Sequence, residues 1–169
     1  SRYLWLGMSP TPTVASAPRG WLFYLDDGGL EDFTNASLMS EADMTTWRAA
    51  VVRAKDWCEA RGIAYFFTVA PGKSLIYPER YPRTVRRVSR ISRVDQLLTS
   101  VSDAGVAIDV RPALLAEKRH ARLFNKTDTH WNPRGAYVAY RALIEMMRVR
   151  VPAIPPPPPL EAFEVVVKR

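Results

Sequence analysis

Apolar residues recur at helical spacing in two stretches of the first two thirds of the chain. The first stretch follows Ser40, where Asp43 stands three residues later and predicts a capping box. Its apolar positions are Met44, Trp47, Val51, Ala54 and Cys58. The second stretch ends at Gly105, and its apolar positions are Val88, Ile91, Val94, Leu98 and Val101. Both patterns predict helices that bury one face.

A third helix has a clear start, because Asn132 can cap it and Pro133 fits its first position. We expect this helix to end at Val151, before Pro152. Its expected inward stripe consists of Ala136, Tyr140, Leu143, Ile144 and Met147. A short helix is also predicted over residues 112–118.

β-Branched and aromatic runs between these helices predict strands over residues 20–25, 63–69 and 106–110. The run at 63–69 is typical of a strand covered on both faces. Because strands and helices alternate, the expected fold class is α/β, with parallel strands joined by crossover helices. The prolines at 155–159 predict an extended spacer rather than a ligand for a proline-binding module, and residues 164–168 predict a final strand.

The composition fits one domain with its own core. The chain has 169 residues, of which 47% are hydrophobic and 24% charged. No segment approaches the roughly 18 apolar residues of a membrane span. Residues 3–8 are too short for the core of a signal peptide, and a start at Ser1 rather than Met favours trimming of any targeting segment. The lone Cys58 is interpreted as a buried small hydrophobe rather than a catalytic thiol.

The net charge of +7 points to an anionic partner or surface. Much of the excess comes from six arginines within fourteen residues: Arg80, Arg83, Arg86, Arg87, Arg90 and Arg93. They form either a solvated helix face or a groove for a polyanion. No nucleic-acid motif accompanies the charge, so nucleic acid is a weaker prediction.

The segment from Asp128 to Ala136 carries the clearest candidate chemistry. In an extended segment, side chains two residues apart point the same way, so Asp128 and His130 can face one site. Such a pair lets a carboxylate orient the histidine that takes a proton from a nucleophile. A structural hydrogen bond is the alternative interpretation. Trp131 either shields the pair from water or offers a flat face to a sugar.

A metal site and a phosphate loop fit the sequence less well. The chain has two histidines, and His120 lies among cations that disfavour a divalent metal ion beside His130 and Asp128. Residues 71–74 resemble the end of a phosphate loop but lack its earlier glycine. We therefore expect neither a metal nor a cofactor.

The loop at residues 70–74 follows the predicted strand at 63–69, at the edge where ligands bind in parallel sheets. Lys73 and the nearby Tyr77 are interpreted as substrate contacts or structural groups. Ser74 would be a nucleophile only if the fold brought it to His130, and no nucleophile motif surrounds it.

Three blocks of sequence together resemble a known family. They are residues 20–24, residues 70–73 with 77–79, and residues 128–131 with 135–136. Over about residues 18–148 the chain resembles the SGNH-hydrolase-like domain of the alginate O-acetylation proteins. The resemblance implies a three-layer, flavodoxin-like parallel sheet flanked by helices, complete or lacking its C-terminal part.

The resemblance also implies a function. Such domains transfer acetyl groups from a donor to hydroxyls of an exported polysaccharide in the bacterial periplasm, beside a membrane-bound O-acyltransferase. It gives Asp128 and His130 the catalytic roles, and Lys73, Tyr77 and Trp131 become expected substrate contacts. The family's serine nucleophile lies downstream of the Asp-x-His segment, in a block that is not identifiable in this chain.

Two hypotheses therefore remain open. The chain belongs to an O-acetyltransferase or acetylesterase, or it is a non-catalytic glycan-binding or scaffold domain. The exopolysaccharide is either anionic or neutral. We expect an N-terminal extension at 1–17, the α/β domain at 18–150, and a proline-rich linker with a terminal strand at 151–169. A periplasmic location is expected, with anchoring to the inner membrane by a segment absent here.

Overall fold

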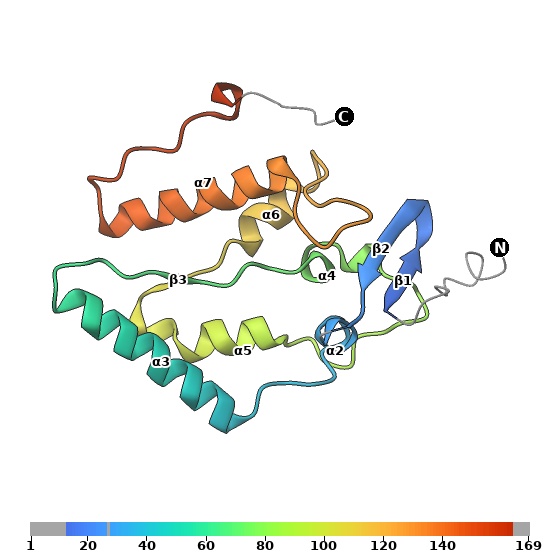
Figure 1. Ribbon diagram of the computed structural model, residues 1–169, viewed down its shortest axis with the longest axis horizontal. Coiled ribbons are helices and arrows are strands. Elements are labelled where there is room, and N and C mark those ends of the chain that lie inside the picture. The colour runs from blue at the N-terminus through green and yellow to red at the C-terminus, as the bar shows by residue number, and fades with distance from the viewer. Residues whose placement is uncertain (1–12, 27, 164–169) are drawn as a thin grey trace.

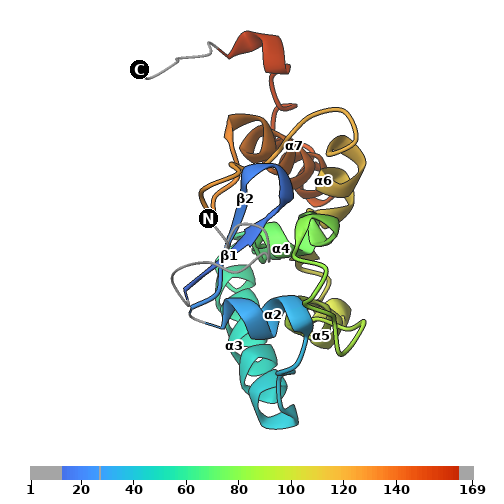
Figure 2. The same ribbon diagram turned by 90° about the vertical axis from the view of Figure 1, so that its right-hand side faces the viewer.

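The computed structural model describes residues 13–26 and 28–163, in which a short strand pair lies between two groups of helices (Figure 1). One group contains α3 (Glu41–Glu59) and α5 (Arg93–Ser100). The other contains α6 (Arg111–Glu117) and α7 (Pro133–Arg150). Figure 2 shows the two groups at opposite ends of the turned view. The helices within each group pack against each other, so the described chain is a layered α/β structure.

The strand pair confirms the predicted parallel arrangement but is short. Strand β3 (Phe67–Thr68) pairs in parallel with β4 (Ala107–Ile108). The prediction that residues 63–69 are covered on both faces is wrong, since Ile63 is 49% exposed. The cluster on this side of the pair joins Val51 to Val101 and Val106, with Phe67 packed against it. Phe66 packs against the other, larger cluster, so the apolar run contacts both sides but is buried along only part of its length.

Both capping signals on the α3 and α5 side fix where the helices begin. The Asp43 backbone N–H donates to Ser40 Oγ at 3.1 Å, and the Ser40 N–H donates to Asp43 Oδ2 at 3.2 Å, which confirms the predicted capping box. Ser92 and Asp95 form the same motif at the start of α5. The prediction that this helix spans Val88 is therefore wrong: the cap satisfies the first turn at Ser92, and Val88 is 77% exposed.

The first predicted strand lies in an antiparallel hairpin rather than in the parallel sheet. Strand β2 (Trp21–Tyr24) pairs with β1 (Val14–Ala17) across the 3₁₀ turn η1 (Pro18–Gly20). Two successive left-handed residues, Arg19 at φ 64° and Gly20 at φ 77°, reverse the chain there. Strand β1 falls within the segment expected to be an extension, and the domain boundaries stay predictions.

Helix α7 begins where the sequence indicates, but its buried stripe is shifted. The Gly135 N–H donates to Asn132 Oδ1 at 2.9 Å, which confirms Asn132 as the cap. The buried positions are Gly135, Val138 and Ala139, while Leu143 and Met147 of the predicted stripe are partly buried against the core. Tyr140 is 40% exposed, so its predicted inward position is wrong. An ion pair of 2.5 Å between Arg134 and Glu117 joins α7 to α6 on the polar side.

Several short elements escaped the sequence patterns because each is too short to show a period. They are α2 (Gly29–Thr34), α4 (Lys73–Ile76), η2 (Pro78–Arg80), η3 (Ser102–Ala104) and η4 (Leu160–Ala162). The proline stretch is tied to α7 where the Tyr137 hydroxyl donates to the Pro158 carbonyl at 3.0 Å. The strand predicted at 164–168 lies outside the described residues.

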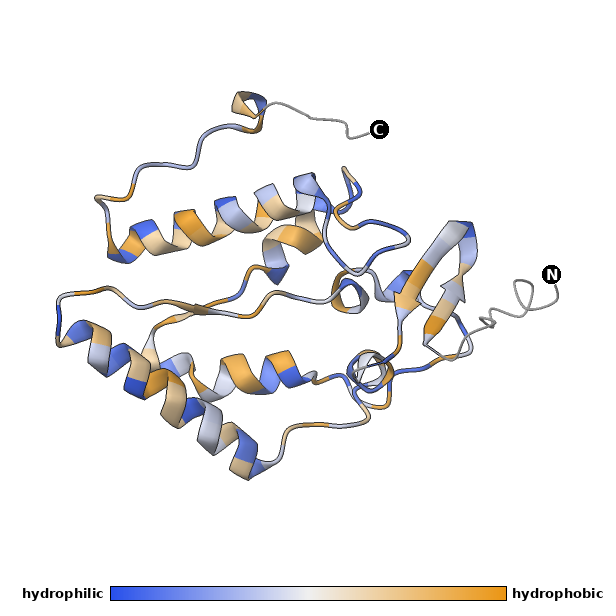
Figure 3. Cartoon of the chain, viewed as in Figure 1, coloured by the Kyte–Doolittle hydropathy of each residue, from blue (hydrophilic) through white to orange (hydrophobic). Residues whose placement is uncertain are grey.

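An aromatic cluster joins the hairpin to α4 and the segment before α7, and Figure 3 shows apolar colouring along parts of both hairpin strands. Trp21 contacts Tyr77 with ring centroids 4.8 Å apart. Tyr77 meets Phe124 edge-on at 6.2 Å. Tilted and edge-on aromatic contacts of this kind add to the free energy gained from burial. The cluster therefore fixes the base of the loop that carries Asp128 and His130. Among the described helices, none combines the length and apolar character needed to cross a membrane.

Candidate functional site

Asp128 and His130 lie on a hairpin-like loop between Phe124 and Trp131, which form an isolated antiparallel bridge. The Asn125 N–H donates to the His130 carbonyl at 3.2 Å, and the Asn132 N–H donates to the Leu123 carbonyl at 2.8 Å. These bonds close the loop at its base. The predicted pair therefore projects from a fixed base into solvent.

The two predicted catalytic side chains are in direct contact. Nδ1 of His130 lies 2.7 Å from Oδ1 of Asp128. The same oxygen accepts the backbone N–H of His130 at 3.0 Å. These two bonds from His130, the backbone one first, hold the pKa of Asp128 below its ordinary value, so the carboxylate is ionised at neutral pH.

The histidine presents its other nitrogen outward. Its side chain is 78% exposed, and its ring contacts within the described chain, Asp128 and Thr129, are both at Nδ1. A carboxylate on Nδ1 favours the tautomer whose Nε2 can accept a proton. The arrangement can therefore provide an oriented general base.

Lys73, predicted as a substrate contact or structural group, lies under this loop. Its Nζ donates to the carbonyls of Asn125 at 3.1 Å, Lys126 at 3.1 Å and Asp128 at 2.7 Å. The residue is only 5% exposed. Burial lowers the pKa of the ammonium to about 8, and the Asp128 carboxylate opposes this shift. Since an ammonium has three N–H donors, the protonated form can satisfy all three carbonyls.

The two other predicted substrate contacts are also part of the loop's support. Tyr77 is 4% exposed, and its hydroxyl accepts the Leu123 N–H at 3.0 Å. Trp131 is half-buried, with its ring centroid 6.3 Å from that of Phe124. Neither contact tests whether these residues also touch a substrate, so that role stays a prediction.

The third sequence block contains a glycine, Gly135, at a position where the backbone leaves no room for a side chain. A Cβ at this position would overlap the Leu123 carbonyl oxygen and lie 3.0 Å from the Cβ of Trp131. The first turn of α7 therefore packs directly against the backbone at the base of the loop. Any larger residue must push these segments apart.

We expect Gly135→Ala to lower the free energy of unfolding by about 1–3 kcal/mol, because the added methyl group must displace backbone rather than a flexible side chain. Urea unfolding followed by circular dichroism measures this change. Gly72→Ala is the matched control, since a Cβ there meets only Ser74 Oγ at 3.8 Å. Equal stability of the two variants would show that the close packing of Gly135 is unimportant.

The other residues considered as candidate nucleophiles, metal ligands or anion-binding groups do not lie against the Asp128 and His130 pair. Neither Ser74 nor any other serine in the described chain hydrogen-bonds the His130 ring. Within residues 13–26 and 28–163, no cluster of three or more His, Cys, Asp or Glu residues could hold a metal ion. Cys58 is half-buried on α3. The prediction of a helical arginine face is wrong, because residues 81–92 contain no helix.

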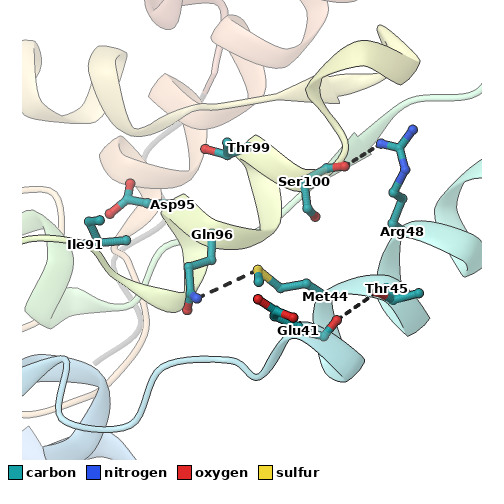
Figure 4. Close-up of a pocket in the computed structure, with 9 residues that line it drawn as sticks. All are labelled: Glu41, Met44, Thr45, Arg48, Ile91, Asp95, Gln96, Thr99 and Ser100. Carbon is teal, nitrogen blue, oxygen red and sulfur yellow. Dashed lines mark hydrogen bonds between the residues drawn. The ribbon is translucent and has the colours of Figure 1, made fainter.

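Several surface hollows of the described chain lie away from the Asp128 and His130 pair, and two of them are relevant here. One is a groove of about 770 Å³ between α3 and α5. In Figure 4, Met44 faces Gln96 across it and Arg48 donates to the Ser100 carbonyl. A smaller pocket of about 340 Å³ includes Arg119, Arg122 and Lys126. In the sequence, the charge around His120 argued only against a metal, and it did not predict these side chains as binding residues.

Solved structures place this arrangement in a known fold. The O-acetyltransferase domain of Pseudomonas putida AlgJ superposes with a TM-score of 0.58 at 23% identity, over 83% of this chain and 49% of that chain. Bacillus cereus PatB1 with a sulfonyl adduct superposes with a TM-score of 0.54 at 14% identity, over 81% and 44%. The chain is thus an SGNH hydrolase-like domain of mixed α/β structure.

The family follows from the sequence comparisons. The family model "SGNH hydrolase-like domain, acetyltransferase AlgX" matches residues 14–162, and the chain belongs to this family. This match confirms the resemblance drawn from the three sequence blocks.

Curated relatives are much longer than the chain. A probable alginate O-acetylase AlgJ from Pseudomonas syringae pv. tomato is 30% identical over 133 residues, covering 78% of this chain and 32% of that protein. The corresponding protein of Pseudomonas aeruginosa is 30% identical over 146 residues, covering 85% and 36%. The chain spans about a third of the length of these relatives.

Proposed function

We propose that the protein containing this chain transfers acetyl groups from a donor to hydroxyls of an exported polysaccharide, with hydrolysis of the same acetyl ester as the competing reaction. The observation that carries the proposal is the 2.7 Å contact between Asp128 and the Nδ1 of an outward-facing His130. Membership of the acetyltransferase family supports it. So do relatives named as probable alginate O-acetylases.

In the proposed reaction, His130 Nε2 accepts the proton of a serine hydroxyl while the serine oxygen attacks the acetyl carbonyl. The bond to the donor's leaving group then breaks, and that group departs with the proton. A polysaccharide hydroxyl attacks the resulting acetyl-serine, which releases the acetylated sugar and restores the serine. Asp128 holds the histidine tautomer throughout. The serine is expected downstream of the Asp-x-His segment.

Three further parts of the proposal follow the family. The short β3–β4 pair would belong to a three-layer parallel sheet flanked by helices. The protein would act in the periplasm, anchored to the inner membrane by a segment outside this chain. A membrane-bound O-acyltransferase would supply acetyl groups.

The test uses the protein encoded by the full-length parent gene, a chromogenic acetyl ester and an alginate oligomer. We expect donor turnover and acetylated oligomers detected by mass spectrometry, with water as the competing acceptor. Ser74→Ala is the control and should keep activity, since Ser74 does not contact the His130 ring. Absence of both transfer and hydrolysis would refute the proposal. Loss of turnover in Ser74→Ala would refute the prediction that the nucleophile is a serine downstream of the Asp-x-His segment.

A non-catalytic glycan-binding or scaffold domain is the second candidate. It is favoured by the lack of a serine contact to His130 within the described residues. This candidate predicts polysaccharide binding that persists in the double variant Asp128→Ala and His130→Ala, in a protein without esterase turnover. The same assay therefore separates the two functions.

A further inference from the structure

A cationic pocket of about 340 Å³ lies beside the loop that carries Asp128 and His130. It is formed where the hairpin turn, η2 and the segment before Phe124 meet. Six basic side chains line it together with His120: Arg19, Arg80, Lys118, Arg119, Arg122 and Lys126. No carboxylate belongs to the described lining. We propose that this pocket binds the carboxylate groups of a uronic-acid-containing polysaccharide, an inference that rests on the proposed acetyl transfer to a polysaccharide.

The charges of the pocket are largely uncompensated. Lys118 pairs with Glu79 at 3.0 Å. The five other cations of the pocket have no ion pair within residues 13–26 and 28–163. Outside the pocket, most arginines that form an ion pair link two segments of the fold in this way, as Arg111 does with Asp95 and Asp109. Clustered cations without partners raise the local concentration of an anion and strengthen its binding.

Arg80 adds a second observation. Its Nε is buried and has no hydrogen-bond acceptor in the described part of the chain. The guanidinium carbon lies 5.9 Å from the centre of the Trp21 ring. A buried N–H without an acceptor costs free energy, and a carboxylate offers two oxygens that match the guanidinium fork. Arg80 is therefore a cation of the lining that a ligand carboxylate can pair, although its Nε itself is shielded from solvent.

The pocket is held in shape by bonds between its walls. Lys126 Nζ donates to the Arg19 carbonyl at 3.0 Å, and the Leu22 N–H donates to the Lys126 carbonyl at 2.8 Å. Tyr77 ties the opposite wall to the Leu123 N–H. Such preorganisation lowers the entropy lost when a ligand binds.

The same contacts connect the pocket to the candidate catalytic pair. Lys126 stands two residues before Asp128, and Lys73 Nζ bonds both of their carbonyls. A polymer held by its carboxylates in the pocket would therefore lie beside the loop that carries His130.

The aromatic residues of the pocket favour a sugar acid over a nucleic acid. Trp21 and Tyr77 are each 4% exposed, and their rings pack on each other. Single-stranded nucleic acid binds through exposed aromatic faces on which bases stack. This pocket offers positive charge but no exposed aromatic face for a base to stack on. That combination fits the carboxylates of a saturated sugar ring better than it fits a nucleic acid.

The test compares two triple variants of the full-length parent protein, each of which removes three positive charges. The pocket variant is Arg119→Gln, Arg122→Gln and Lys126→Gln. The control variant is Arg83→Gln, Arg86→Gln and Arg90→Gln, which changes exposed arginines outside the pocket. The probe is a fluorescent oligouronate, with its carboxyl-reduced neutral form and a single-stranded DNA of equal charge as comparisons.

We expect the pocket variant to raise the Kd for the oligouronate at least about tenfold in 0.1 M salt, and the control variant to change it less than about threefold. The neutral oligomer should bind weakly to all forms. Equal losses in both triple variants, or no loss in the pocket variant, would overturn the proposal. So would tighter binding of DNA that is lost in the pocket variant.

Binding and chemistry fail separately in this design. A parent protein that binds the oligouronate through the pocket but neither transfers nor hydrolyses acetyl refutes the proposed function and leaves the pocket standing. A parent protein that transfers acetyl while the pocket variant binds normally refutes the pocket alone.

Discussion

Asp128→Asn in the full-length parent protein is expected to lower acetyl-ester turnover by about 10²–10⁴-fold. Asp128 Oδ1 now accepts from both the ring Nδ1 and the backbone N–H of His130. Because one oxygen accepts both bonds, an amide keeps them only with its own oxygen in that place. With its NH₂ group there, it donates to the ring and selects the opposite tautomer. Nε2 would then carry the proton and could not accept one from the nucleophile. The measurement is kcat for a chromogenic acetyl ester at neutral pH.

Thr129→Val is the matched control for this prediction. The Thr129 hydroxyl is 3.4 Å from Asp128 Oδ1 and 3.5 Å from His130 Nδ1, which is the outer limit of hydrogen bonding. Its removal should leave turnover within about threefold of the wild-type value, a loss of less than about 1 kcal/mol. If Asp128→Asn keeps full activity, or if both variants lose it equally, Asp128 does not set the tautomer.

Lys73→Met is expected to lower the free energy of unfolding by about 2–4 kcal/mol, because it leaves the carbonyls of Asn125, Lys126 and Asp128 without their shared donor. Methionine keeps most of the side-chain volume, so lost hydrogen bonds rather than a cavity cause the change. Hydrogen exchange of the amides of residues 123–132 should become faster than in the wild type.

Lys118→Met is the control, since Lys118 is also largely buried and bonds a carbonyl, that of Ile76 at 2.6 Å. It does not bond the loop at 125–128. We expect it to leave hydrogen exchange in that loop unchanged. Equal acceleration by the two variants would show that Lys73 has no specific effect on the loop.

The pH dependence gives a second measurement on Lys73. Because burial lowers its folded pKa from 10.5 to about 8, the folded protein gives up this proton more readily than the unfolded chain. Burial of the charged ammonium therefore opposes folding most strongly below about pH 8, and this opposing effect disappears as pH rises towards 10.5. The stability of the wild type relative to Lys73→Met should rise between these values. Above pH 8 the neutral amine has two donors, so resonances of residues 125–128 should titrate in the wild type only.

Local signals in the sequence were sufficient where one short motif settles the structure. Ser40 with Asp43, and Asn132 with Pro133, place the starts of α3 and α7 correctly, because a cap is decided by residues within one turn. The signal at Ser92 with Asp95 had the same form, and the apolar spacing from Val88 obscured it. The parallel relation of β3 and β4 also followed from element order.

Patterns failed where burial depends on distant partners. The apolar residues at 20–25 could not show that β1 would pair with them, since two left-handed residues at the turn decide the hairpin. Tyr140 fits an apolar stripe by spacing, but the neighbours of α7 cover the adjacent face. Arg83, Arg86, Arg87 and Arg90 are exposed but do not form a helix face, because residues 81–92 contain no helix.

The sequence by itself determined the family, the Asp128 and His130 pair and the helix that follows the pair. The pair could be predicted because its two residues lie close together on one short loop, which is a local relation. Only the tertiary structure decided what lies beneath and beside that loop. Lys73 reaches it across more than fifty residues of sequence to bind three of its carbonyls. Residues from the hairpin, η2 and the segment before Phe124 meet only in space to form the cationic pocket. Hydrogen bonding and charge act over a few ångströms, and which groups come that close is a property of the folded chain.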